Sequence, residues 1–224
     1  MSQFHNRNLK DGLIDQLITL YVGKKIKEMR ETMGIVKLQK ILFLSQSEME
    51  KDKVNGLHHV YVRDAQGARS IGVYRDRGVL SRAGLYTEEY TEITKRGIEY
   101  VSYFEELFDK NQAIMDYVNG VLHVVGHMNS KQITDYGHEY IMQYGGQSIK
   151  VEDIAMGEEI LIPLSDEESD IIFEMSDEWV ESIRAMLNPD YMAGYEQVVQ
   201  EMKSDTYLTH KEVFGHEQEW TLQT

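Results

Sequence analysis

Residues Val36 to Gln46 read VKLQKILFLSQ, and apolar side chains recur in this stretch at the three- and four-residue spacing of an amphipathic helix. The periodicity continues to Met49, so one helix is expected across the whole segment. A longer helix is expected before it, from Leu9 to Met33, with Gly34 as its C-terminal stop. Its apolar positions are Leu13, Ile14, Leu17, Ile18, Tyr21, Val22, Ile26 and Met29. Two successive amphipathic helices are therefore predicted for this part of the chain.

Short elements are expected to follow the two helices. Residues 57–62 have the β-propensity of a strand, and Ser70 is a suitable N-cap for a helix that runs to Ala83. The segment 85–93 favours a hairpin, and Thr94 can cap a further helix that reaches Phe108. Helix, helix, strand, helix, hairpin, helix is the order of a winged-helix domain, which we place at residues 1–110.

The rest of the chain is predicted to be mainly helical. Residues 111–145 are expected to form a helical extension of two helices, the second capped by Ser130 and running through Met142. Residues 146–224 are expected to form an acidic, helical C-terminal region that binds a partner, with helices beginning at Ser176 and at Asn188. The predicted fold class is α+β and predominantly helical.

Net charge divides the chain into two unlike regions. The formal net charge is −15, yet residues 1–110 hold 18 Lys and Arg against 16 Asp and Glu. Residues 111–224 hold the other 5 basic residues against 22 acidic ones, so this region alone has a balance of −17. Such a region attracts basic surfaces and repels nucleic acid. A contribution to solubility alone would also account for the asymmetry.

Composition excludes several classes of function. The chain contains no cysteine, which excludes thiolate chemistry and is typical of a reducing compartment, so we expect a cytoplasmic protein. No apolar run is long enough for a signal peptide or a membrane span. The glycines match neither a P-loop nor a dinucleotide-binding motif, and no Gly-x-Ser-x-Gly element occurs. We therefore expect a protein that is not an enzyme, needs no cofactor and acts by binding a partner; homo-oligomerisation is left open.

The histidines give no clear metal site. His123 and His127 are four residues apart on an expected helix and could bind one ion with His138 and Glu139, but the glutamate of a His-Glu-x-x-His site is absent. The adjacent His58 and His59 would point to opposite faces of the expected strand and could not bind an ion together. Structural or surface histidines are therefore predicted, with a metal-dependent enzyme as an alternative.

Two parts of the first 140 residues resemble a known family. The stretch VKLQKILFLSQ at 36–46 resembles the opening helix of the Panacea (SocA-like) antitoxin domain and of related phage-type winged-helix proteins. The segments YRDRGVLSRAGL at 74–85 and YTEITKRG at 90–97 resemble the later winged-helix portion. The resemblance covers about residues 10–140. It implies a winged-helix fold and a role in a toxin-antitoxin system.

The C-terminal region has a second resemblance. The segments NPDYMAGYEQVVQEMKSD at 188–205 and YLTHKEVF at 207–214 look like the acidic tail of Phd and YefM antitoxins, which wraps a toxin. Together, the two resemblances imply an antitoxin that neutralises a basic protein toxin by direct binding. Apolar stripes on acidic helices can enter a groove on such a partner. The expected partner-binding residues are Trp179, Ile183, Met186, Tyr191, Tyr195, Val198, Met202 and Phe214. The same stripe could instead pack on the protein's own core.

The alternative function is a winged-helix transcriptional regulator that binds DNA. Arginines on or beside the expected recognition helix could read the major groove, and basic residues after the wing could contact phosphates. These residues are Arg69, Arg75, Arg77, Arg82, Lys95 and Arg96. The balance of only +2 over residues 1–110 weighs against a nucleic-acid surface, which normally has a marked basic stripe. Ordinary solvated charge would explain them too.

Overall fold

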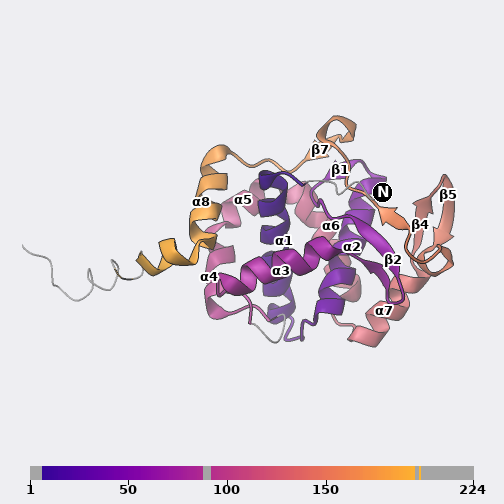
Figure 1. Cartoon of the computed structure of the whole chain (residues 1–224), viewed down its shortest axis with the longest axis horizontal. Coiled ribbons are helices and arrows are strands. Elements are labelled where there is room, and N and C mark those ends of the chain that lie inside the picture. The colour runs from indigo at the N-terminus through magenta and orange to yellow at the C-terminus, as the bar shows by residue number, and fades with distance from the viewer. Residues whose placement is uncertain (1–6, 88–91, 195–196, 198–224) are drawn as a thin grey trace, which may run out of the picture.

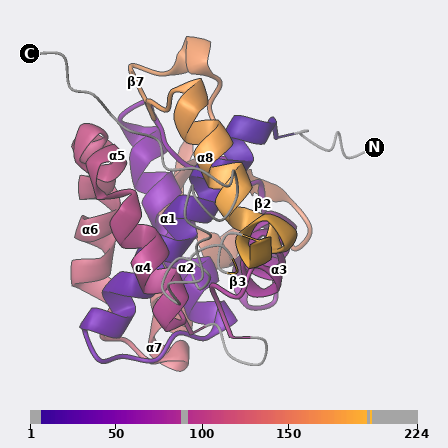
Figure 2. The same cartoon turned by 90° about the vertical axis from the view of Figure 1, so that its left-hand side faces the viewer.

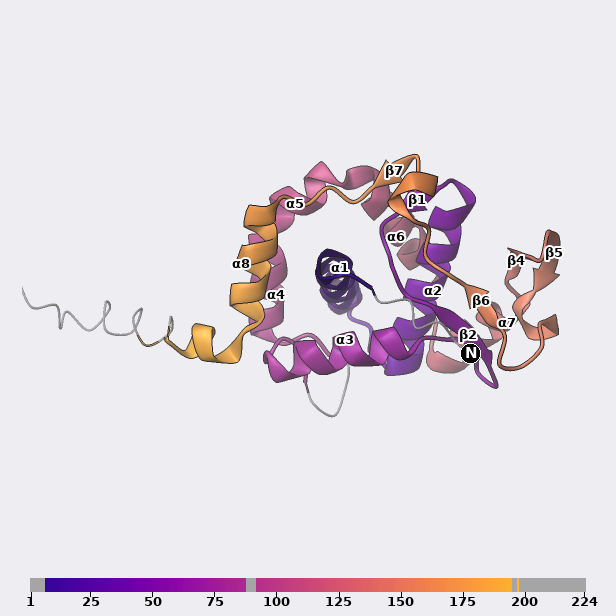
Figure 3. The ribbon, with the colours of Figure 1, turned by 45° about the horizontal axis from the view of Figure 1, so that its top comes forward.

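The fold is built around one buried helix. The computed structural model describes residues 7–87, 92–194 and 197. Helix α1 (Leu9–Glu28) is buried on every side, because residues 13–15 and 17–20 are all enclosed. A helix enclosed on all sides belongs in the centre of a core. Figure 3 views α1 along its axis, with α3, α4, α8, α5, α6 and α2 around it and α7 farther out, on α2.

The labelled helices that follow α1 in the described part of the chain are α2 (Ile35–Lys51), α3 (Ile71–Arg82), α4 (Lys95–Tyr103), α5 (Glu105–Lys110), α6 (Gln112–Val125), α7 (Ser130–Glu139) and α8 (Asp177–Leu187) (Figure 1). Residues 189–194 are also helical, where a helix was expected to begin at Asn188. Side chains cap the starts of α1, α3, α4 and α7, and the cap of α7 is Asn129 instead of the expected Ser130. The side chains of Ser70 and Thr94 accept hydrogen bonds from the backbone N–H groups of Gly72 and Gly97, as predicted for α3 and α4. Helix α8 lies against α1, and Trp179 packs edge-on against Phe104 (Figure 2).

The strands are short and form three separate sheets. The largest has the order β3 (Gly67–Arg69), β2 (Tyr61–Asp64), β6 (Glu159–Leu161), and both pairings are antiparallel. A hairpin consists of β4 (Ile141–Tyr144) and β5 (Gln147–Lys150), while β1 (Val54–Asn55) pairs in parallel with β7 (Ile171–Ile172). Two 3₁₀ turns, η1 (Val151–Asp153) and η2 (Asp166–Glu168), lie in the connections. The α+β, predominantly helical class is confirmed.

Three expected elements differ from the structure. The strand expected at 57–62 begins only at Tyr61, because the preceding N–H groups of His58 and His59 donate to the side chains of Asp15 and Gln46 instead of to a neighbouring strand. The helix expected from Thr94 to Phe108 is interrupted at Phe104, whose fully buried side chain lies between α4 and α5. The helix expected to reach Met142 ends at Glu139, since β4 follows immediately.

The three predicted ranges share one hydrophobic core. Buried residues from 1–110, from 111–145 and from the described part of 146–224 belong to a single cluster, for example Leu17, Val118 and Ile183. Pairing of β2 with β6 and of β1 with β7 also joins the first range to the last. The expected hairpin at 85–93 is represented by one antiparallel bridge between Tyr86 and Ile93, and its tip lies outside the described residues.

None of the helices in the described part of the chain combines the length and apolar character that a membrane span requires.

Candidate functional site

A group of charged side chains is buried beside α1. We call Arg7, Asp15, His59 and Asp76 the charged cluster. Asp15 and Asp76 are 0% and 1% exposed. The Arg7 Nη1 atom lies 2.5 Å from Asp15 Oδ2 and 2.7 Å from Asp76 Oδ2, and Arg7 Nη2 lies 2.6 Å from Asp76 Oδ1. His59 Nε2 lies 2.8 Å from Asp76 Oδ2. Each buried carboxylate therefore contacts a cationic or hydrogen-bonding partner, as burial of charge requires.

Three separate elements position the cluster. Asp15 comes from the centre of α1, Asp76 from the buried side of α3, and His59 from the irregular segment before β2. That segment is held because Gln46 donates to the His59 carbonyl oxygen and accepts from its N–H group. His58 attaches the same segment to α1, since its backbone N–H donates to Asp15 Oδ1 at 2.9 Å and its Nδ1 lies 3.1 Å from the same oxygen.

The cluster shifts the pKa values of its members. Burial alone would raise the pKa of Asp15, but the positive fields of His59, His58 and Arg7 lower it well below its ordinary value. Burial alone would lower the pKa of His58, but the carboxylates of Asp15 and Asp11 raise it overall. The charged forms of Asp15 and His58 therefore stabilise each other in the folded protein.

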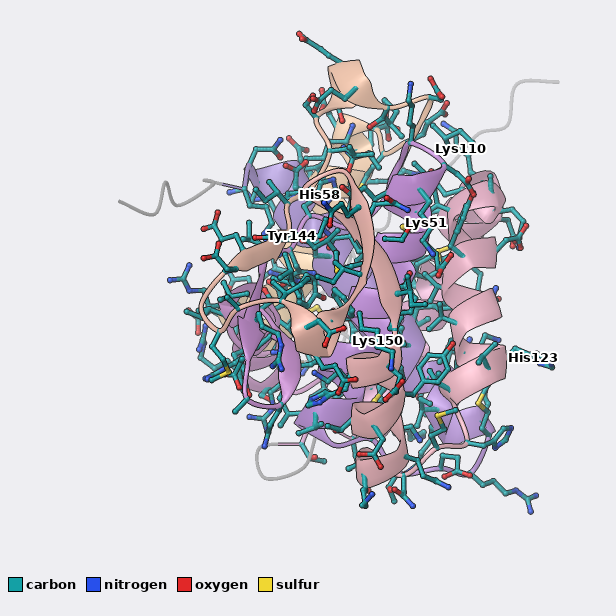
Figure 4. All side chains as sticks on the ribbon, turned by 90° about the vertical axis from the view of Figure 1, so that its right-hand side faces the viewer. Lys51, His58, Lys110, His123, Tyr144 and Lys150 are labelled. Carbon is teal, nitrogen blue, oxygen red and sulfur yellow. The ribbon has the colours of Figure 1, made fainter. Side chains whose placement is uncertain are left out.

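A cavity of about 630 Å³ opens beside the cluster. Its lining includes Arg7, His58 and His59, together with residues of β2, the start of α3 and the segment 156–159. In Figure 4, His58 lies within the body of the molecule, whereas His123 projects away from it. One donor atom each from Asp15, His59 and Asp76 lies within 4.8 Å of the other two. Two carboxylates and an imidazole are a ligand set that suits divalent metal ions.

A second hollow, the α6–α7 groove, lies on a different part of the surface. It has a volume of about 600 Å³ and is lined mainly by α6, with Tyr136 of α7 on one side and two residues of α2. Val124 is 53% exposed there, and Tyr136 is also exposed. Acidic side chains lie among the lining, namely Glu48 and Asp116. The groove is therefore apolar with acidic groups beside it. The other lining residues are Leu44, Ala113, Tyr117, Gly120, Val121, Val125, Tyr140 and Ile171.

The predicted partner-binding residues fall into three groups. Ile183 is fully buried in the protein's own core, and Trp179 and Met186 are partly buried against it. Tyr191 is exposed. The remaining four lie outside the described residues: Tyr195, Val198, Met202 and Phe214. On α8, the apolar stripe thus packs largely inward.

The predicted DNA-contacting residues are spread over strand β3 and the helices α3 and α4. Arg75 and Arg82 are exposed on α3, while Arg69 precedes α3 and pairs with Asp64 at 3.0 Å. Arg77 is also on α3, and it is only partly exposed. Lys95 and Arg96 begin α4. The structure therefore places two exposed arginines two helical turns apart on α3, whereas Arg69 lies beside the cavity.

Sequence reasoning missed the charged cluster. The argument that His58 and His59 point to opposite faces depended on a strand, but both rings approach Asp15: His58 Nδ1 at 3.1 Å and His59 Nε2 at 3.8 Å. A signal was present, because Asp15 lies among the apolar residues of the first expected helix. In contrast, the described residues bring no metal-binding group together at His123, His127, His138 and Glu139.

Comparisons with family models, with curated proteins and with solved structures gave no match to this chain.

Proposed function

We propose that this protein is an antitoxin that neutralises a basic protein toxin by direct binding, with the α6–α7 groove as the contact surface. The observation that carries the proposal is an open apolar groove in the acidic part of the chain. Exposed apolar side chains that gather around a hollow are typical of protein-binding surfaces. The toxin-antitoxin role itself rests on the resemblance to Panacea, Phd and YefM proteins.

Charge supports a basic partner. Glu48 and Asp116 line the groove, and the Tyr117 hydroxyl donates to Asp52 at 2.7 Å. Lys51 is the nearby cation, and it is already paired with Glu48 at 2.8 Å. An apolar segment flanked by Lys or Arg would bury its apolar side chains in the groove, and its charges would speed the encounter.

The test compares substitutions at two positions whose wild-type side chains are about equally exposed. Val124→Lys changes the groove, while Leu9→Lys changes a side chain at the start of α1 that is 55% exposed and does not line the groove. Tagged wild-type protein and both variants are purified from the native host, and bound proteins are identified by mass spectrometry. We expect a basic protein to be recovered in stoichiometric amounts with wild type and Leu9→Lys, and to be lost with Val124→Lys.

Growth supplies the second half of the test. The recovered protein, expressed alone, should arrest growth, and co-expression of wild type or Leu9→Lys should restore it. Retention by Val124→Lys would rule out the groove as the contact surface. A partner that leaves growth unaffected would rule out the antitoxin role while leaving protein binding intact.

A second candidate is DNA binding through a winged helix. It is favoured by the exposed Arg75 and Arg82 on α3 and by the Tyr86–Ile93 bridge, which lies where a wing would begin. Electrophoretic mobility shifts at several salt concentrations test it, because phosphate contacts weaken steeply as salt rises. We expect Arg75→Ala combined with Arg82→Ala to abolish any such shift if α3 enters the groove of DNA.

A further inference from the structure

The two buried carboxylates of the charged cluster face a single cationic nitrogen. Arg7 Nη1 contacts one oxygen of Asp15 and one of Asp76, at 2.5 and 2.7 Å. Two carboxylates in a protein interior require a cation between them, because burial of unpaired charge is very costly. Arg7 comes from outside the helices and is the most exposed member of the cluster. It is therefore the member that can leave most easily.

An imidazole completes a three-atom donor set. His59 Nε2 lies 2.8 Å from Asp76 Oδ2 and 3.8 Å from Asp15 Oδ2. Donor atoms around a metal ion at bond lengths of about 2.0–2.2 Å are separated by roughly 3–3.5 Å. The two separations from His59 Nε2 bracket this spacing, and the two carboxylate oxygens lie within 4.8 Å of each other. His58 holds the other oxygen of Asp15, and Gln16 Nε2 donates to the other oxygen of Asp76 at 3.2 Å, as outer-shell partners do at metal sites.

An unsatisfied buried group provides an independent indication of a ligand. Tyr61 is fully buried, its ring packs edge-on against His59, and its hydroxyl has no hydrogen-bond partner among the described residues. Buried hydroxyls normally have a partner, often a water molecule or a bound species. The 630 Å³ cavity gives a path to the cluster, because His58, His59 and Arg7 line it.

We propose that Asp15, His59 and Asp76 form a site for one divalent transition-metal ion, and that Arg7 competes with the ion for the two carboxylates. The ion would be bound by one oxygen of each carboxylate and by His59 Nε2. His59 would bind as the neutral imidazole with its one ring proton on Nδ1, so that Nε2 carries none, and the Arg7 guanidinium would move from the cluster into the cavity. The remaining ligand positions would face the cavity and its water.

Calorimetric titration of the chelator-treated full-length protein with ZnCl₂, and separately with MnCl₂, tests the site. Wild type should bind one ion, and Arg7→Gln should bind it at least about tenfold more tightly because the competitor has been removed. His59→Gln should weaken binding by at least about tenfold, within the range seen when metal-site residues are changed. His123→Gln is the matched control, since this histidine is exposed and remote from the cluster, and it should bind as wild type does.

Failure of both wild type and Arg7→Gln to bind either ion would overturn the proposal, as would binding that His59→Gln leaves unchanged. Circular dichroism establishes that each variant is folded. If His59→Gln does not fold, histidine ring resonances of Arg7→Gln decide the question: substoichiometric Mn²⁺ should broaden those of His59 before those of His123. Broadening of His123 first would place the ion elsewhere and reject the site.

Discussion

The charged cluster and the α6–α7 groove differ in which side chains they bury: charged ones in the cluster, but not all of the apolar ones in the groove. The cluster buries Asp15 and Asp76 completely and satisfies them with Arg7 and His59, whereas the groove leaves apolar side chains such as Val124 in contact with solvent. Neither arrangement is what the hydrophobic effect alone would produce. The two regions should therefore differ in their effect on stability: changes in the cluster should lower the free energy of unfolding, and changes in the groove should leave it nearly unchanged.

The largest effect is expected from Asp76→Asn. This change removes the carboxylate charge that Arg7 Nη2 and His59 Nε2 contact and leaves Arg7 with Asp15 alone. Removal of one partner of a buried ion pair costs about 3–5 kcal/mol. Urea unfolding followed by circular dichroism measures the loss, and Asp135→Asn on the surface of α7 is the control. A loss below about 1 kcal/mol, the size expected of an exposed pair, would show that the cluster contributes little to stability.

A somewhat smaller loss is expected from Ile183→Ala on α8. Ile183 is fully buried, so its truncation should cost about 2–5 kcal/mol through lost burial and a residual cavity. Tyr191→Ala is the control, because that side chain is 56% exposed and should change stability by less than about 0.5 kcal/mol. Equal, small effects of both changes would mean that α8 is not docked on the core.

Much of the helical framework could be predicted from local patterns in the sequence. Periodicity located α1 and α2, and the caps Ser70 and Thr94 located the starts of α3 and α4, because these signals depend on neighbouring residues. The helix expected over the first segment ends earlier than predicted, at Glu28, since Arg30 turns the chain with a φ of 61° before Gly34 is reached.

The charged cluster could not be predicted in the same way. Asp76 lies 69 residues beyond Arg7, and only tertiary packing brings the two side chains together. The β propensity of the segment before β2 predicts a strand, yet hydrogen bonds from its backbone N–H groups to the side chains of Asp15 and Gln46 determine its shape. The α6–α7 groove could be predicted in part. Periodicity predicts its helices, but it does not predict that Val124 is exposed to solvent.

The pH dependence of stability should show the contribution of His58, which lies beside the charged cluster. Its pKa is raised above the ordinary value of 6.5, because Asp15 and Asp11 outweigh the effect of burial. A raised pKa contributes stability that is fully present below pH 6.5 and is lost as pH rises through the folded value. The free energy of unfolding should therefore fall with rising pH above about 6.5 in wild type, and His58→Gln should flatten this part of the profile.

Asp15 provides the control for that experiment, because its pKa is shifted in the opposite direction. The lowered pKa of Asp15 contributes stability above the ordinary value of 3.8 that is lost as pH falls. His58→Gln should therefore retain an acid-induced loss of stability. Urea midpoints measured between pH 3 and pH 9 would reveal both limbs, and an unchanged slope above pH 6.5 in His58→Gln would show that another group is responsible.

The smallest effect on stability is expected from Val124→Lys in the groove. Val124 already contacts solvent, and a lysine there can place its ammonium group in water near Asp116. The change in the free energy of unfolding should lie within about 0.5 kcal/mol of wild type, as for most surface substitutions. The same measurement on Val121→Lys, one turn earlier and buried, should show a loss of several times that size. If Val124→Lys were as damaging as Val121→Lys, the groove would be part of the core and could not serve as the surface that binds a toxin.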